Sequence, residues 1–286
     1  MNRVTRWIER SPYTAALGVR VIEIADESVR LVLPFAHENS NGDKALHGGV
    51  AASMIDVGAQ ALAQVVLGEE AGRCHTAALH VAYLSAALGE PIEAEARLLR
   101  RGRELAFIDI AVNSESGKPV ARGLATVRGG FGADAPITPP SPADDGSADP
   151  GPMGPYLQHV PFHAKLGLAA EHMAGGRSRI VMPWQDSNAD VHGGVHEGAV
   201  LALLDTTGAM AAWAETGPGR FKASTPGIQA RFFGPPDQTD LVGFGHVLLH
   251  DRETLFAEVD VARADDHRLV ARGTVNYRIV KPEPRD

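Results

Sequence analysis

The sequence contains a single cysteine, Cys74, in 286 residues. One cysteine excludes an intramolecular disulfide, and we therefore expect the protein in a reducing compartment. Basic residues are also scarce, because 27 lysines and arginines stand against 35 acidic residues and leave a formal net charge of −8. Proteins that bind nucleic acids generally carry a basic face, so nucleic acid is not an expected partner.

Signals for export or membrane insertion are missing as well. Charged residues are spread through the first ten positions, which is unlike a secretory signal. The longest apolar segment, 48–67, carries Asp56 and two glutamines, and this argues against a bilayer-spanning helix. Hydrophobic residues nevertheless make up 44% of the chain, which is enough for packed cores. We expect a cytoplasmic protein without a membrane partner.

What the sequence does contain is a repeat of itself at a shift of 149 positions. The shift pairs Pro12 with Pro161, Gly18 with Gly167, Asn39 with Asn188, His47 with His196, and Asp56 with Asp205. Later in each copy one residue is gained, so that the Ala-Arg-Gly at 121–123 matches the one at 271–273. A shift that holds without gaps over most of each half indicates a tandem duplication of one domain.

A segment rich in proline and glycine, 129–155, separates the two copies. These residues oppose regular helix or strand, so the segment is predicted to be an extended linker. We therefore expect a first domain at 1–130, a linker at 131–154 and a second domain at 155–286.

Each copy is predicted to have the same order of elements. In the first copy a short N-terminal helix precedes two alternating strands (19–35), a loop (36–46), an apolar helix from 48, and strands at 77–87, 92–101, 104–114 and 119–129. One long helix followed by an antiparallel meander is an α+β arrangement, in which the sheet can curve around the helix.

The long helix raises a question of its own, because it is apolar on every face and yet contains Asp56. An all-round apolar helix is typical of a protein core. An ionised carboxylate in a core costs several kcal/mol unless it is paired, hydrogen-bonded or facing a wet cavity. Asp205 occupies the same place in the second copy. The two acids are therefore candidate functional residues, and the alternative is a structural acid satisfied by local donors.

The surroundings of these acids carry a resemblance to a known family. The loop residue Asn41 is followed by His47, Gly48 and Gly49, and the acid comes nine positions after the histidine. Thr76 follows, seven residues before Tyr83 of the next predicted strand. This combination resembles the hotdog-fold thioesterases of the phenylacetate-degradation (PaaI-like) type, and the resemblance covers both copies.

The resemblance implies two hotdog domains, each a long buried helix wrapped by a curved antiparallel sheet. It also implies that the two pair side by side as a pseudo-dimer within one chain. The implied substrate is an acyl-CoA, with coenzyme A entering as part of the substrate and no further cofactor. Hotdog pairs commonly assemble further, so a homo-oligomer is expected.

In such pairs the active sites lie at the seam between domains, where one domain supplies the loop and helix start and the other supplies the acid. Asn41, His47 and Gly48 would then face Asp205 and Thr225. The Gly48 amide, with the Asn41 side chain, would stabilise the oxyanion, because helix starts carry free N–H groups. Asp205 would act as general base on water held by Thr225, or less favourably as nucleophile. His47 would fix the loop or contact the thioester.

A second composite site would use Asp56 and Thr76, opposite the loop of copy two. That loop departs from the pattern, because Glu197 stands where copy one has Gly48 and Asp190 where it has Asn41. The second site is therefore expected to be the weaker one.

Further residues are predicted to bind substrate. Arginines at the 97–104 hairpin suit coenzyme A phosphates, although a solvated turn is an equal alternative. His192 and His196 have metal-site spacing but no third ligand, so no metal is expected. The predicted substrate-binding set is Gly49, His196, Gly198, Arg100 and Arg101.

These observations together favour an acyl-CoA thioesterase that hydrolyses a small or medium acyl or aryl thioester. The alternatives are a non-catalytic protein that binds acyl-CoA or an aromatic ligand at the same seam, and a hotdog hydratase or dehydratase. The different Asp/His arrangement that the last chemistry usually requires is not found in the sequence.

Overall fold

The computed structural model describes residues 3–130, 144, 146–234 and 237–281. Of the predicted linker, 131–143 and 145 lie outside the described residues. The first copy consists of α1 (Arg3–Arg10), α2 (Pro12–Leu17), β1 (Arg20–Ile24), β2 (Ser28–Leu33), η1 (His37–Asn39), α3 (Gly48–Leu67), η2 (Glu69–Ala71), β3 (Cys74–Tyr83), β4 (Ile92–Arg101), β5 (Leu105–Ser114) and β6 (Pro119–Gly129).

The second copy repeats this order after a short helical turn in place of α1. It consists of η3 (Gly154–His159), α4 (Pro161–Leu166), β7 (Ala169–Ala174), β8 (Arg177–Met182), η4 (Asp186–Asn188), α5 (Glu197–Thr216), β9 (Lys222–Phe232), β10 (Leu241–Asp251), β11 (Thr254–Arg263) and β12 (Leu269–Val280). The same local signals operate in both copies. For example, α2 and α4 both begin with proline and end at a glycine in the left-handed conformation.

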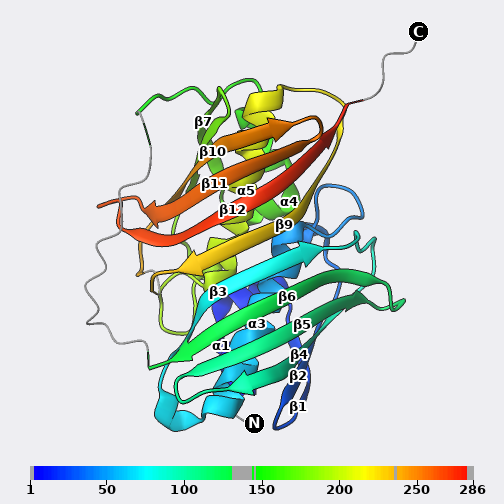
Figure 1. Cartoon of the computed structure of the whole chain (residues 1–286), viewed down its shortest axis with the longest axis vertical. Coiled ribbons are helices and arrows are strands. Elements are labelled where there is room, and N and C mark those ends of the chain that lie inside the picture. Colours follow the sequence, from blue (N-terminus) through cyan, green and yellow to red (C-terminus); the bar gives the residue numbers. More distant parts are fainter. Residues whose placement is uncertain (1–2, 131–143, 145, 235–236, 282–286) are drawn as a thin grey trace.

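The strands of both copies form one sheet of 12 antiparallel strands, in the order β1-β2-β4-β5-β6-β3-β9-β12-β11-β10-β8-β7. The order is the same from either end once copy-one strands are exchanged for their copy-two equivalents. The halves therefore meet at β3 and β9, which pair from Ala78↔Arg231 to Ala82↔Gly227. Figure 1 shows these two strands crossing the middle of the molecule, with α3 and α5 behind the sheet.

Each long helix is held against its half of the sheet on almost all sides. In α3 only three of the 20 residues are more than slightly exposed, namely Gly48, Gln64 and Val65. The helix begins after His47, whose ring accepts a hydrogen bond from the Gly49 amide, and ends before Gly68, which has φ of +76°. By length and hydropathy Gly48–Leu67 is long and apolar enough to cross a membrane. This differs from the expectation that Asp56 and the two glutamines make the segment too polar for a bilayer-spanning helix. Its burial inside the protein accounts for that composition.

The repeated Ala-Arg-Gly motif has a packing cause. A Cβ atom at Gly123 on β6 would overlap the side chain of Ile55 on α3. At the matching Gly273 on β12, a Cβ atom would overlap the Gln229 carbonyl of β9 and would lie 2.9 Å from Leu204 Cδ1 on α5. The glycine therefore lets the helix lie close to the sheet in both halves.

The helices α3 and α5 also pack against each other and run antiparallel. A Cβ atom on Gly49 would lie 3.0 Å from Ala202 Cβ, and one on Gly198 would lie 3.1 Å from Ser53 Cβ. The start of each helix therefore lies beside the second and third turns of the other. This arrangement creates two related regions between the halves. In seam A the start of α3, at Gly48, lies near Asp205 of α5. In seam B the start of α5, at Glu197, lies near Asp56 of α3.

Candidate active site

Seam A holds a cavity of about 710 Å³. Its walls come from both halves. Copy one supplies the loop before α3, the first turn of that helix and the end of β3, whereas copy two supplies η3, the middle of α5 and the start of β9. Of the predicted catalytic residues it is lined by Asn41, His47, Gly48, Asp205 and Thr225.

Asp205 is the only acidic residue among the described residues that line this cavity. It projects from α5, is 4% exposed, and accepts a hydrogen bond of 3.0 Å from Thr225 Oγ1 on β9. Burial raises its pKa to about 6, and the Thr225 hydrogen bond acts in the opposite direction. Asp205 is therefore a carboxylate that is ionised near neutral pH and still basic enough to take a proton.

The start of α3 lies directly opposite. A Cβ atom on Gly48 would be 3.4 Å from Asp205 Oδ2, so the carboxylate lies within van der Waals reach of the helix start. As the first residue of α3, Gly48 has no carbonyl four residues earlier within the helix to accept its N–H. The positive end of the helix dipole, at Gly48, therefore lies beside Asp205.

His47 fixes the helix start through a chain of hydrogen bonds. Its Nδ1 accepts from the Gly49 amide at 2.9 Å, so the neutral ring carries its proton on Nε2 and donates it to His163 Nε2 at 2.9 Å. The Nδ1 of His163 then donates to the Leu157 carbonyl at 3.2 Å. Burial lowers the pKa of both histidines, that of His163 to about 4, which keeps them neutral. His47 thus braces the loop, while its ring also lines the cavity.

Asn41 lies at the exposed rim of the cavity, and its backbone N–H is used by the Ala45 carbonyl. The buried asparagine of this loop is Asn39, which donates to the Leu17 carbonyl at 2.9 Å and accepts from Lys165 Nζ at 2.7 Å. Asn188 makes the equivalent bond to the Leu166 carbonyl in copy two. Asn39 therefore holds the loop in place, and Asn41 remains the amide with access to a ligand.

Tyr83 is a residue of this site that sequence analysis did not select. Its ring lies 3.4 Å from a Cβ position on Gly48, and its buried hydroxyl has no hydrogen-bond partner among the described residues. Burial, followed by the charge of Asp205, raises its pKa well above the usual value, so it stays protonated. A signal was present in the repeat, because the matching residue of copy two is Phe232 and lacks the hydroxyl.

The far wall of the cavity is largely apolar. Met153, Leu157 and Val160 line it from the η3 segment, and Met210 and Trp213 line it from α5. The Trp213 indole N–H donates to the Tyr277 hydroxyl at 3.1 Å, which satisfies that polar atom. An apolar chain or ring that entered here would have its polar end near Gly48 and Asp205.

Seam B differs, because the Glu197 side chain occupies the space that Gly48 leaves open in seam A. Its carboxylate accepts from the Thr76 amide at 3.0 Å and from Gln60 Nε2 at 2.7 Å, and it pairs with His75 Nδ1 at 2.9 Å. Gln60 also donates to Asp56 Oδ2 at 2.9 Å. Seam B is therefore filled by a hydrogen-bonded network that crosses between the halves.

Asp56 is fully enclosed by this network. It has no exposed surface, and its Oδ1 accepts from Thr76 Oγ1 at 2.6 Å. Burial, followed by the charge of Glu197, raises its pKa. Neither Asp56 nor Thr76 is among the described residues that line either cavity. The structural alternative, an acid satisfied by local donors, describes the geometry of Asp56.

Four of the predicted substrate-binding residues lie away from the cavity of seam A. Gly49 and Gly198 allow the close approach of α3 and α5, and their amides are taken by His47 and His196. Arg100 and Arg101 are exposed at the end of β4. Across β5 and β6, strand register makes them level with the start of β3 and not with Tyr83 at its end. The structure therefore does not bring these four residues together with Asp205, because helix packing and strand register decide where they lie.

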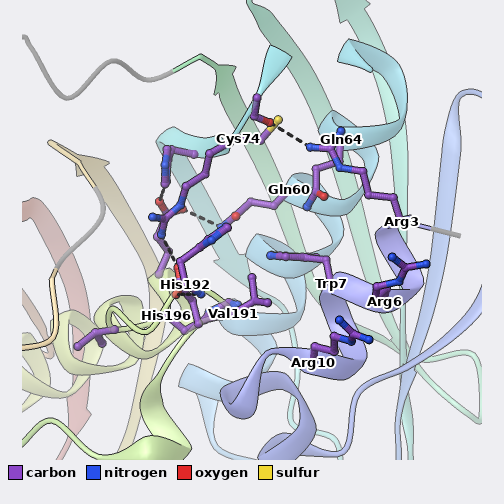
Figure 2. Close-up of a pocket in the computed structure, with 16 residues that line it drawn as sticks. Arg3, Arg6, Trp7, Arg10, Gln60, Gln64, Cys74, Val191, His192 and His196 are labelled. Atoms are coloured by element: carbon purple, nitrogen blue, oxygen red, sulfur yellow. Dashed lines mark hydrogen bonds and ion pairs between the residues drawn. The ribbon is translucent and has the colours of Figure 1, made fainter. Parts of the chain in front are cut away.

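His196 is the fifth, and it lies at seam B. It lines a second, smaller cavity of about 270 Å³, shown in Figure 2, together with His192. Within the described part of the chain, no group of three or more His, Cys, Asp or Glu side chains is arranged to hold a metal ion.

Comparison with known proteins bears on the fold. Residues 44–121 match the family model of the thioesterase superfamily. A conserved protein of unknown function with a hot dog fold from Alicyclobacillus acidocaldarius is similar over 96% of this chain and 98% of its own, with a TM-score of 0.62 and 15% identity. The fold is a double hotdog.

Two further double-length structures are similar to this hotdog chain. The tesB protein of Mycobacterium avium subs. paratuberculosis has a TM-score of 0.67 at 12% identity, covering 95% of this chain and 100% of its own. Acyl-CoA thioesterase II TesB2 of Mycobacterium marinum has a TM-score of 0.66 at 12% identity, covering 97% and 100%. At these identities the likeness concerns the fold. No curated protein matches the chain.

Proposed function

We propose that seam A hydrolyses acyl-CoA thioesters, in the manner expected for a PaaI-like hotdog protein. The observation that carries the proposal is the meeting of Gly48 and Asp205 in one cavity. The helix start of the first half lies beside a buried carboxylate of the second, with 3.4 Å between Oδ2 and the Cβ position of the glycine. The match of residues 44–121 to the thioesterase superfamily includes Gly48 and supports the same chemistry.

The oxyanion is stabilised at the start of α3. The thioester carbonyl oxygen points at the Gly48 amide, where the free N–H and the helix dipole offset the negative charge of the tetrahedral intermediate. A single donor of this kind contributes about 3–4 kcal/mol to transition-state stabilisation. Tyr83 and Asn41, which also line the cavity, carry further side-chain donors.

Asp205 activates water. The carboxylate removes a proton from a water molecule as its oxygen bonds to the thioester carbon. The intermediate then collapses, the C–S bond breaks, and the proton held by Asp205 passes to the leaving thiolate of coenzyme A. The products are the free acid and coenzyme A, and the carboxylate is regenerated. Thr225 donates to Oδ1 and so leaves Oδ2 directed at the reacting centre.

The acyl group is accommodated by the apolar wall. A cavity of about 710 Å³ lined by Met153, Met210 and Trp213 fits a small or medium acyl or aryl chain. Acyl-CoA thioesterase is also the activity named for the Mycobacterium marinum structure with the same fold. We propose acyl-CoA as the substrate class on these two grounds.

The test is a thiol-release assay over short, medium, branched and aromatic acyl-CoAs. We expect turnover of at least one class by the native protein. Asp205→Asn is the background control, and its release should not exceed buffer hydrolysis. Saturable binding of acyl-CoA without thiol release by the native protein would replace the proposal with a non-catalytic binding function. An absorbance change typical of an enoyl-CoA, without thiol release, would replace it with hydratase chemistry.

A further inference from the structure

The cavity at seam B has a composition unlike that of seam A. Its volume is about 270 Å³, and it lies between α1, the exposed side of α3 and the loop before α5. Figure 2 shows Arg6, Trp7 and Arg10 of α1 on one side of it and His192 and His196 on the other. Among the described residues, four arginines and two acidic residues line this cavity. The protein as a whole is acidic, so this is a local concentration of positive charge.

Both acids in the lining already have partners. Asp190 forms an ion pair with Arg73, and Glu197 is held by His75, Gln60 and the Thr76 amide. By contrast, Arg6 and Arg10 are exposed and form no ion pair with any residue that the structure describes. The charge of these two guanidinium groups therefore remains available to a ligand.

His196 supplies a buried donor in the same wall. It is 2% exposed, and its Nδ1 accepts from the Gly198 amide at 2.9 Å. Burial, followed by the charge of Arg73, lowers its pKa to about 3, so the ring is neutral and carries its proton on Nε2. This N–H has no acceptor among the described residues. An unmade buried hydrogen bond destabilises the folded protein, and an acceptor that reached this donor would remove that penalty.

The two helix starts are alike except for the partner of the histidine Nε2–H. In seam A the corresponding Nε2–H of His47 is satisfied by His163. In seam B the residue at the place of His163 is Thr14, and its hydroxyl donates to the carbonyls of Ile8 and Ser11. The Nε2–H of His196, a residue that lines the cavity, is therefore without an acceptor from the part of the chain that the structure describes.

The segment that covers each seam shows the same contrast. At the shift of 149 positions, Arg3, Arg6 and Arg10 correspond to Pro152, Pro155 and His159. The copy-two segment lines seam A with apolar side chains, and the copy-one helix lines seam B with guanidinium groups. Seams A and B therefore differ in two ways: in the charge of the segment that covers them, and in having Gly48 or Glu197 at the helix start.

We infer that seam B is a binding site for a phosphate-bearing small molecule. Phosphate oxygens are acceptors that match the forked donors of Arg6 and Arg10, and one of them would accept the His196 Nε2–H. The indole of Trp7, whose ring centroid lies 6.1 Å from that of His196, offers a flat face to an attached base. Inorganic phosphate and the adenosine bisphosphate part of coenzyme A share this chemistry.

The test is isothermal titration of the full chain with inorganic phosphate and with adenosine 3′,5′-bisphosphate. The informative variant is Arg6→Gln with Arg10→Gln. The matched control is Arg20→Gln with Arg231→Gln, because these two exposed arginines line neither cavity and their removal changes the net charge equally. We expect the native protein and the control to bind at least one probe with the same affinity, and the informative variant to bind it at least tenfold more weakly.

Tighter binding of the bisphosphate than of phosphate would identify the nucleotide as the ligand, and equal binding would identify phosphate alone. Equal weakening in both double variants, or no binding of either probe by the native protein at millimolar concentration, would overturn the inference. The ¹⁵N resonance of His196 Nε2 gives a second readout, since it should shift on binding. Titration measures binding without turnover, so its outcome is independent of the thioesterase proposal.

Discussion

At the scale of single residues, Asp205 and Asp56 are the same residue in a duplicated sequence with different surroundings. Sequence patterning predicted both as buried acids, because a helix that is apolar on every face leaves a carboxylate no exposed side. It did not predict how each would be satisfied. Asp205 has one hydrogen bond and an open cavity beside it, whereas Asp56 is held by Thr76 and Gln60. The difference depends on where the Glu197 side chain points, which pattern alone does not give.

The pKa of Asp205 leads to a prediction for the pH dependence of catalysis. The base must be ionised, so kcat/KM should be constant above pH 6 and fall about tenfold per pH unit below it. Thr225→Val removes a hydrogen bond that lowers this pKa, and one bond of about 1 kcal/mol corresponds to about 0.7 pH unit. The inflection should therefore move to higher pH in that variant. The check is a kcat/KM profile from pH 4.5 to 9.

Thr76→Val is the matched control for this profile, because Thr76 makes the same bond to Asp56 at seam B. Its profile should coincide with that of the native protein. A shift in the control of the same size, or an unmoved inflection in Thr225→Val, would show that the titrating group is not Asp205.

At the scale of elements, the helix starts are the features on which both seams depend. The sequence predicted the long helix and the histidine-glycine turn that begins it, because local patterning is enough for these. It assigned Gly48 to the oxyanion and Gly49 to substrate binding, so both were expected at the site. In the structure only Gly48 faces the cavity, and Gly49 lies against Ala202 where the two helices approach. Two adjacent residues on a helix point about 100° apart, so their roles depend on how the helices pack.

Alanine at each glycine should separate these roles. A methyl group at Gly48 would meet Asp205 and Tyr83 at 3.4 Å, an ordinary contact, but would take up space beside the carboxylate where the thioester is proposed to react. We expect Gly48→Ala to lower kcat/KM by about a hundredfold or more with little change in stability. At Gly49 the methyl would lie 3.0 Å from Ala202 Cβ, so Gly49→Ala should lower the free energy of unfolding by about 1–3 kcal/mol.

Denaturant unfolding and thiol-release kinetics on the two variants measure these effects. If Gly49→Ala reduced activity more than Gly48→Ala at equal folded fraction, the assignment of Gly48 as the amide at the reacting centre would be wrong.

At the scale of the whole molecule, the duplication decides the architecture. The 149-position repeat predicted two equivalent halves, and the single sheet joined at β3 and β9 confirms the predicted fold. The sequence did not give the register of the strands, so it could not show that Arg100 and Arg101 lie away from seam A. It also gave no indication that α1 would bring three arginines to seam B. Both depend on contacts between segments that are distant in the chain.

The same duplication supplies the most direct test of the central claim, that one seam is catalytic and the other is not. Asp205→Asn and Asp56→Asn make the same change at equivalent places, and thiol-release kinetics should compare them on one acyl-CoA at equal folded fraction. We predict that Asp205→Asn lowers kcat/KM by about 10² to 10⁴, the range of general-base catalysis, and that Asp56→Asn stays within about threefold of the native protein. An equal loss in both variants, or a loss confined to Asp56→Asn, would contradict the account.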